Sequence, residues 1–151
     1  MITIEEFKKK QTSKTRLIGL DLGSKRIGVS ICDERQSIAT PFKTINRINT
    51  SALVAELKEI IKENNIKGIV IGNPINMDGT LGSSAQSVKD ISTNISKFID
   101  LPVFLWDERL STVGAFNLSS QLDVNISKKI KKIDENAAAF ILQGAIDYLN
   151  N

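Results

Sequence analysis

Three acidic residues stand out as groups that could do chemistry. They are Asp21 in the apolar segment GLDLG, Glu108 in WDERLST and Asp134 in IDENAAA. A charge within an apolar strand is costly unless it is paired or binds a cation. The chain has no histidine and a single cysteine, which excludes a histidine base, an intramolecular disulfide and a cysteine-rich zinc site. Chemistry that relies on carboxylates favours hard cations such as Mg²⁺ or Mn²⁺.

Each acid also has an ordinary structural explanation. Asp21 could cap the turn toward Lys25 and Arg26, and Glu108 could pair with the arginine that follows it. Asp134 could be the N-cap of the helix expected after it. Carboxylates that converge repel one another, and bound divalent cations relieve that repulsion. The three acids therefore predict a metal site if the fold brings their segments to one edge.

Two groups of basic residues could contact phosphates. Lys25 and Arg26 follow the first expected strand, and four lysines precede Asp134: Lys128, Lys129, Lys131 and Lys132. For the four lysines we favour contact with a nucleic-acid backbone, because they would lie at the mouth of the site. For Lys25 and Arg26, a solvated hairpin is an equal alternative.

Composition narrows the partner class. The net charge of +3 permits a nucleic-acid partner without requiring one. Aromatic residues make up 5% of the chain, too few to predict a stacking platform for single strands. We therefore expect recognition of structured nucleic acid through its shape and phosphates.

The elements that must position these residues follow from hydrophobic spacing. Three strands come first, near residues 17–20, 27–31 and 38–44, and Pro41 indicates that the third lies at an edge. A helix then follows the capping candidates Thr50 and Ser51, and residues 68–72 form a buried strand. A second helix should place Val88, Ile91, Ile95 and Phe98 on one face, and a strand at residues 102–106 contributes Phe104 and Trp106 to the core.

The remaining elements complete an α/β fold. A short helix should open at Ser111 or Thr112, and a final helix should span residues 138–149. This order predicts an antiparallel half followed by parallel strands joined by right-handed crossovers. The Gly-, Asn- and Ser-rich segment 73–84 is predicted to be a mobile flap over the nucleic acid.

Length and the N-terminal segment set the expected domain organisation. Residues 1–15 are polar with only a hint of helix at residues 4–10, so we expect a loosely ordered extension before one domain at residues 16–151. No apolar run is long enough to span a bilayer, and the first residues lack the pattern of a secretory signal. The expected location is the cytoplasm.

Four segments of the chain resemble the YqgF/RuvX family. They are DLGSKRIGVS (residues 21–30), IVIGNPINMDGTLG (69–82), LPVFLWDERLST (101–112) and IDENAAAFILQ (133–143). The resemblance runs from Arg16 to the C-terminus and implies a ribonuclease-H-like fold with a five-stranded mixed sheet flanked by helices. The chain departs from the family pattern at Asn73, where an apolar residue is usual, and at Ile130, which interrupts a basic run.

The resemblance also implies a function. Members of the family are described as Holliday junction resolvases and nucleases that process pre-16S rRNA during ribosome biogenesis. It therefore implies a hydrolase that cleaves phosphodiester bonds of structured RNA, four-way DNA junctions or both. The family's acidic set falls on Asp21, Glu108 and Asp134, as catalytic residues that bind two Mg²⁺ or Mn²⁺ ions with Asp21 between them. The role of Asp107 and the choice between monomer and homodimer stay open.

Two other functions are compatible with parts of the sequence. A phosphotransferase of the sugar-kinase, actin and Hsp70 superfamily has phosphate-binding turns that resemble DLGS, but it needs two such domains to enclose a nucleotide. A catalytically idle RNA-binding factor for ribosome assembly could keep the fold for docking alone. The presence of all three acids argues against that second alternative.

Overall fold

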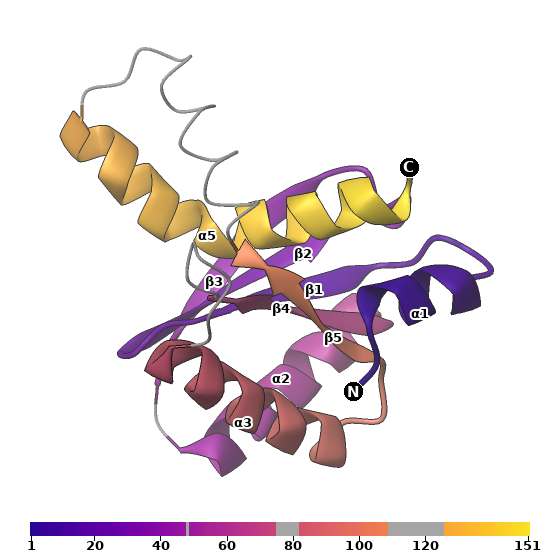
Figure 1. Cartoon of the computed structure of the whole chain (residues 1–151), viewed down its shortest axis with the longest axis horizontal. Helices are drawn as coiled ribbons and strands as arrows, with labels where there is room; N and C mark the ends of the chain where they lie inside the picture. Colours follow the sequence, from indigo (N-terminus) through magenta and orange to yellow (C-terminus); the bar gives the residue numbers. More distant parts are fainter. Residues whose placement is uncertain (48, 75–81, 109–125) are drawn as a thin grey trace.

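The protein is described by a computed structural model that covers residues 1–47, 49–74, 82–108 and 126–151. For residue 83 and residues 126–135 this description is limited to the backbone. Five strands form one sheet in the order β3-β2-β1-β4-β5 (Figure 1). They are β1 (Leu17–Leu22), β2 (Arg26–Cys32), β3 (Ala39–Asn46), β4 (Gly68–Asn73) and β5 (Val103–Asp107).

The strand directions make the sheet mixed. β1 pairs antiparallel with β2, and β2 with β3, whereas β4 runs parallel to both β1 and β5. Pro41 lies on β3 at the edge of the sheet, as predicted, where a missing N–H does not interrupt the ladder. The carboxyl ends of β1, β4 and β5 therefore share one edge.

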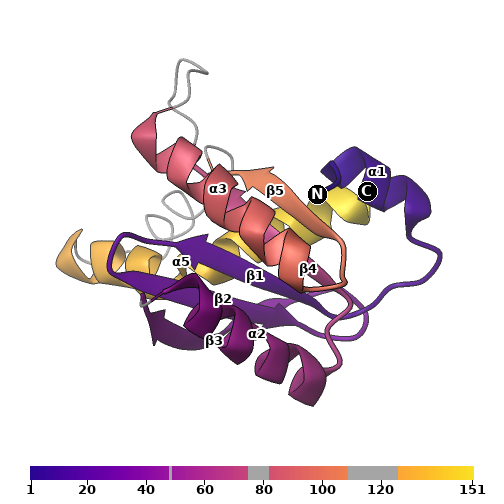
Figure 2. The same cartoon turned by 90° about the horizontal axis from the view of Figure 1, so that it is seen from below.

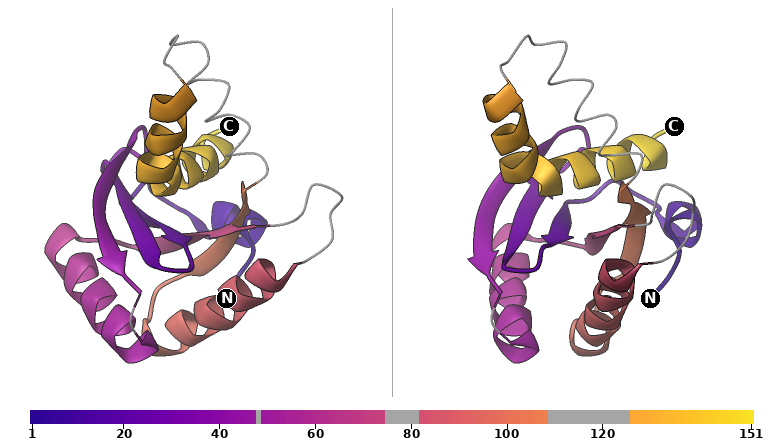
Figure 3. Two further views of the ribbon diagram at one scale, coloured as in Figure 1. Left: turned by 90° about the vertical axis from the view of Figure 1, so that its left-hand side faces the viewer. Right: turned by 60° about the vertical axis from the view of Figure 1, so that its left-hand side comes forward.

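Helices cover both faces of this sheet. Helices α2 (Thr50–Asn64) and α3 (Ser83–Phe98) lie on one face, and α1 (Ile4–Lys10) and α5 (Ile126–Leu149) lie on the other (Figures 2 and 3). Each face has its own apolar cluster, one centred on Leu20, Leu57 and Ile95 and the other on Phe104 and Leu142. None of the helices in the described ranges is long and apolar enough to cross a membrane.

Helix α2 shows how local sequence sets an element's ends. The side chain of Asn49 accepts a hydrogen bond from the Ala52 amide at 2.8 Å and caps the helix, so the expected caps Thr50 and Ser51 were wrong by one or two residues. At the other end, Asn65 adopts a left-handed conformation, φ 54°, which stops the helix.

Helix α5 packs unusually close to β1 and β2 because small residues line its path. A Cβ on Gly19 would lie 2.7 Å from Leu142 Cβ and 3.0 Å from the Ala138 carbonyl oxygen. The buried hydroxyl of Ser30 donates to that same carbonyl at 2.7 Å. The backbone of α5 is thereby held directly against the sheet.

The N-terminal segment is more ordered than expected. Residues 4–10 form α1, so the prediction of a loosely ordered extension was wrong for this stretch. Ile4 and Phe7 are buried, and the Phe7 ring stacks on Phe104 with centroids 4.8 Å apart. The short helix is stabilised by this packing, because its own length is too small to sustain it.

Four further expectations need correction or lie outside the described residues. Helix α5 begins at Ile126, so Asp134 lies within the helix and is not its N-cap. Val88 and Ile95 are buried as predicted, but Phe98 is 59% exposed at the end of α3. The expected short helix after Ser111 and most of the predicted flap, residues 75–81, lie outside the described ranges.

Candidate active site

Asp21 lies near the carboxyl end of β1, on the face of the sheet that α5 covers. Side chains alternate along a strand, so Asp21 shares this face with Gly19, which contacts α5. Asp21 is paired in register with Gly28 of β2, and a Cβ on Gly28 would lie 3.4 Å from Ala138 Cβ and 3.7 Å from Asp21 Cβ. This carboxylate is therefore half-buried beside α5 rather than placed on an outer loop.

Glu108 follows β5 and reaches the same face of the sheet. A Cβ on Gly72, at the end of β4, would lie 2.9 Å from Glu108 Cγ and 2.5 Å from Ile141 Cδ1 of α5. The glycine thus leaves room for the Glu108 side chain to lie over β4. Since β4 lies between β1 and β5, Asp21 and Glu108 lie on either side of the carboxyl end of β4.

The electrostatics of Glu108 reflect this crowding. Burial raises the pKa of Glu108 first of all, the negative charge of Asp21 raises it further, and that of Asp107 adds to both; together they bring it to about 7. A carboxyl group with such a pKa holds a proton near neutral pH unless a cation takes the proton's place. A proton or a bound cation would relieve this crowding of negative charge.

Asp107 is the neighbour whose role the sequence left open. It ends β5 and is paired in register with Asn73 at the end of β4. Its charge is one of the causes of the raised pKa of Glu108, so it belongs to the electrostatic environment of the site. The sequence signal for it was present in the adjacent acids of WDERLST, but that signal could not say which of the two faces α5.

Gly72 is the residue that sequence reasoning missed. Its lack of a side chain allows both Ile141 and Glu108 to approach β4. A small residue at the end of the buried run GIVIG was the available signal, because a glycine in a strand often marks a close approach.

The backbone of Asp134 belongs to the same region. Leu142 and Ala138 lie over Gly19, and Ala138 also lies over Gly28, the partner of Asp21. Going back along α5 therefore leads toward the carboxyl end of β1. Asp134 is one helical turn before Ala138, so its backbone follows this path, while its side chain is outside the described set.

The structure describes the side chains of two of the candidate basic residues and only the backbone of the other four. Lys25 and Arg26 are exposed and border a cavity of about 420 Å³ that Asp21 also lines. Within the turn, the Gly23 amide donates to the Asp21 backbone carbonyl at 3.1 Å, so the main chain closes it. The four lysines at positions 128, 129, 131 and 132 lie in the first turns of α5, with only their backbone described.

The donor set fits a hard cation. Asp21 and Glu108 offer carboxylate oxygens, which are the ligands that Mg²⁺ and Mn²⁺ prefer. Among the side chains that the structure describes, there is no group of three or more Asp, Glu, His or Cys able to hold a metal ion. Asp134, the third carboxylate expected from the sequence, has a side chain outside the described set.

Comparisons with known proteins agree on one family and one fold. A family model described as "RuvX: Holliday junction resolvase" matches residues 15–148. A Pelagibacter ubique protein named "Putative pre-16S rRNA nuclease" is 78% identical over 151 residues, covering 100% of both chains. A Rhodobacter capsulatus protein of the same name is 45% identical over 133 residues, which is 88% of this chain and 84% of that protein.

A solved structure adds evidence on the fold. The structure titled "T. thermophilus RuvC in complex with Holliday junction substrate" superposes with a TM-score of 0.55, covering 89% of this chain and 94% of that one. At 10% identity this likeness concerns the fold alone. Together with the mixed five-stranded sheet, it confirms the expected ribonuclease-H-like architecture.

Proposed function

The chain belongs to the RuvX family, and from that premise we propose that it is a metal-dependent nuclease that cleaves phosphodiester bonds in structured nucleic acid. Its substrates are pre-16S rRNA, four-way DNA junctions or both, the classes named for its family and relatives. The observation that carries the proposal is the placement of Asp21 and Glu108 on one face of the sheet on either side of β4, where burial and the charges of Asp21 and Asp107 raise the pKa of Glu108 to about 7. Such like-charge crowding is costly in a fold unless a cation or proton offsets it.

The proposed metal ligands are Asp21, Glu108 and Asp134. Together these carboxylates would hold Mg²⁺ or Mn²⁺ in a two-metal hydrolysis, as the family resemblance implies. When bound, the ions supply an activated water and neutralise charge on the leaving oxygen, which removes the need for histidine. Support comes from the two described carboxylates on one sheet face and from the course of α5 toward them.

The chain's other residues have positioning and binding roles in this proposal. Gly19 and Ser30 hold α5 against the sheet and so would set the position of Asp134 relative to Asp21. Lys25 and Arg26 border the cavity beside Asp21, where they would attract a phosphate. The four lysines of α5 would contact the nucleic-acid backbone farther from the metal site. The reaction is placed in the cytoplasm, and a monomer or a homodimer could carry it out.

A cleavage assay tests the proposal directly. Labelled precursor rRNA and a four-way DNA junction are incubated with the protein and Mg²⁺ or Mn²⁺, with and without a chelator. We expect cleavage that the chelator abolishes and that Asp21→Asn eliminates while nucleic-acid binding persists, because asparagine keeps the shape but loses the charge. Asp100→Asn, which removes an exposed acid at the amino end of β5, is the matched control and should cleave normally.

Two outcomes would count against the nuclease. Near wild-type cleavage by folded Asp21→Asn would contradict the proposed metal site. Binding of structured RNA without any cleavage by the wild-type protein would favour the alternative of a catalytically idle ribosome-assembly factor.

A further inference from the structure

A groove runs along the outer edge of β5, and Asp107 lies at one end of it. One side of β5 pairs with β4, and on the other side the Ile2 amide donates to the Val103 carbonyl at 3.1 Å. Beyond this hydrogen bond lies a cavity of about 600 Å³, lined by residues 1–6 and 105–107 together with Asn73 and Tyr148. The N-terminal segment therefore forms one wall of the groove and β5 forms the other.

The backbone of β5 can pair with a further strand along this groove. Residues two apart on a strand point their backbone groups the same way, so Leu105 faces the side on which Val103 binds Ile2. Leu105 itself lines the groove. An extended segment lying there would continue the pairing that Ile2 begins, as in recognition by strand addition.

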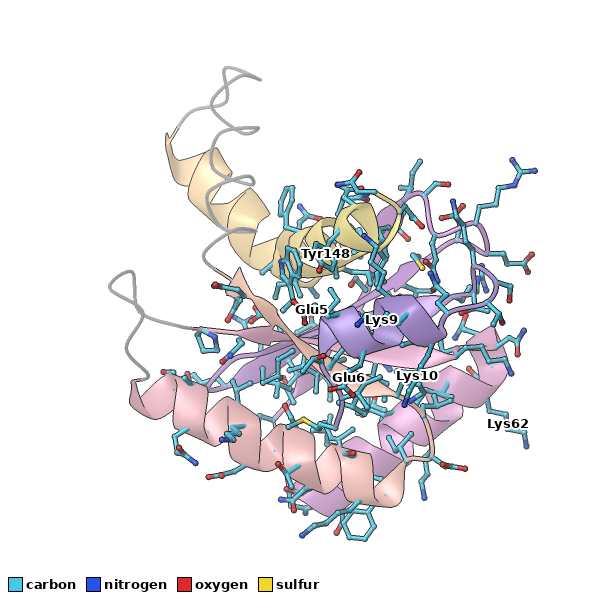
Figure 4. The ribbon with its side chains drawn as sticks, turned by 45° about the vertical axis from the view of Figure 1, so that its right-hand side comes forward. Glu5, Glu6, Lys9, Lys10, Lys62 and Tyr148 are labelled. Carbon is cyan, nitrogen blue, oxygen red and sulfur yellow. The ribbon has the colours of Figure 1, made fainter. Side chains whose placement is uncertain are left out.

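The charges of the groove select the kind of segment. Glu5 and Glu6 are exposed in the first turn of α1, and Tyr148 lies on the neighbouring α5 (Figure 4). The described lining also carries the Asp107 carboxylate and one cation, the Met1 α-ammonium, which donates to Ser96 Oγ at 3.3 Å; none of these residues is Lys or Arg. The lysines of α1 lie in its last turn, and the Lys8 ammonium there donates to the carbonyls of Tyr148 and Asn151.

Glu5 and Glu6 in the N-terminal wall of the groove disfavour a nucleic acid and favour a basic peptide. Phosphates of a nucleic acid would be repelled by Glu5 and Glu6, whereas lysine or arginine side chains would be attracted. The aliphatic floor contributed by Ile2, Ile4 and Leu105 suits the apolar residues that alternate with the basic ones in an extended segment.

We propose that the groove between the N-terminal segment and β5 binds an extended basic peptide of a protein partner, which adds to the sheet beside β5. Its basic side chains pair with Glu5 and Glu6, and its backbone pairs with Leu105. Because Asn73 and Asp107 line one end of the groove, a bound partner lies next to the carboxyl edge of the sheet. The inference does not depend on the nuclease activity.

Binding of defined peptides tests this inference. The probes are acetyl-Val-Arg-Val-Arg-Val amide, its Glu-for-Arg counterpart, and the arginine peptide N-methylated at alternate backbone amides. Trp106 is the only tryptophan and lines the groove, so its fluorescence reports occupancy, and the NMR signal of the Leu105 amide reports pairing. We expect saturable binding of the arginine peptide, weaker by roughly five-fold or more for the acidic one, since exposed charge pairs contribute modestly.

Matched variants separate specific docking from general charge. The double variant Glu5→Gln/Glu6→Gln should weaken binding several-fold, and Glu59→Gln/Glu63→Gln, which removes two exposed acids from α2, should not. The N-methylated peptide should bind more weakly because it cannot complete the backbone pairing. The proposal would be overturned if acidic and basic peptides bound equally, or if both double variants lost binding equally. It would also be overturned if Trp106 and Leu105 responded to an RNA oligomer but to none of the peptides.

Discussion

Glu108 and Asp21 lie on the same face of the sheet with β4 between their strands. Burial and then the charge of Asp21 are the largest causes that raise the pKa of Glu108 to about 7 from its usual 4.5. The folded protein therefore binds this proton more tightly than the unfolded chain does between these two values. In that window the unfolded chain carries fewer protons, so the contribution of Glu108 to stability falls as the pH rises.

We therefore predict a pH-dependent stability difference for Glu108→Gln in the absence of divalent ions. Near pH 4, below both pKa values, Glu108 is mostly protonated in the folded and the unfolded protein, so the two proteins should melt at similar temperatures. Near pH 8 the variant should melt higher, because glutamine has no charge to bury. Thermal melts across this range measure the difference. A constant gap between the two proteins at every pH would show that Glu108 does not titrate as inferred.

Divalent ions should raise the melting temperature of the wild-type protein. A ligand that binds only the folded state adds about 2.7 kcal/mol at a hundred times its dissociation constant. For a chain of this size each kcal/mol is worth roughly 2 to 4 °C. Asp21→Asn should lose this response, yet it should be at least as stable as wild type without metal, because a repelling charge is gone. An unchanged melting temperature with millimolar Mg²⁺ and Mn²⁺ would contradict the metal site.

The close packing of α5 predicts that alanine is tolerated at Gly28 but not at Gly19. Gly19→Ala should lower the free energy of unfolding by about 1 to 3 kcal/mol, because the new methyl group would meet Ser30 Oγ at 2.5 Å and Leu142 Cβ at 2.7 Å. Gly28→Ala should have little effect, because its neighbours at 3.4 and 3.7 Å leave room for a methyl group. Urea unfolding of both variants measures the contrast. Equal losses of unfolding free energy would mean that the close approach of α5 to β1 does not determine the effect of substituting Gly19.

Replacement of Lys128, Lys129, Lys131 and Lys132 by alanine should weaken binding to all structured nucleic acids alike, because phosphate contacts carry little sequence information. The slope of log affinity against log salt should become shallower by about 0.9 for each lysine that no longer neutralises a phosphate of duplex DNA. The control removes four exposed lysines from α2 and α3 on the other face: Lys58, Lys62, Lys89 and Lys97. If the two quadruple variants show the same slope, the α5 lysines form only a solvated surface.

Much of the fold could be predicted because the relevant patterns are local. An apolar run located β1, alternating apolar residues located β2, and Pro41 marked β3 as an edge strand. The motifs marked Asp21 and Glu108 as candidates, but whether they share an edge depended on the strand order, which the structure supplies. Caps were less predictable, since Asn49, Thr50 and Ser51 are all acceptable candidates and only one geometry is realised.

Features that depend on distant residues were not accessible from these patterns. Residues 4–10 are mostly polar, and their helix is ordered because Phe7 stacks on Phe104, far away in the chain. The apolar face predicted for α3 held for Val88 and Ile95 but not for Phe98, the last residue of the helix, which is 59% exposed. Spacing along a helix reports which residues share a side, not how far the opposing layer extends.

The candidate site also has features that residue types predict and features that depend on the fold. Residue types alone indicated carboxylate chemistry with a hard cation, because the chain has no histidine and a single cysteine. The raised pKa of Glu108 instead depends on burial and on Asp21 and Asp107, which Gly72 and the close approach of α5 make possible. Chemical identity is a property of each residue, whereas burial and electrostatic coupling arise from neighbours that only folding brings together.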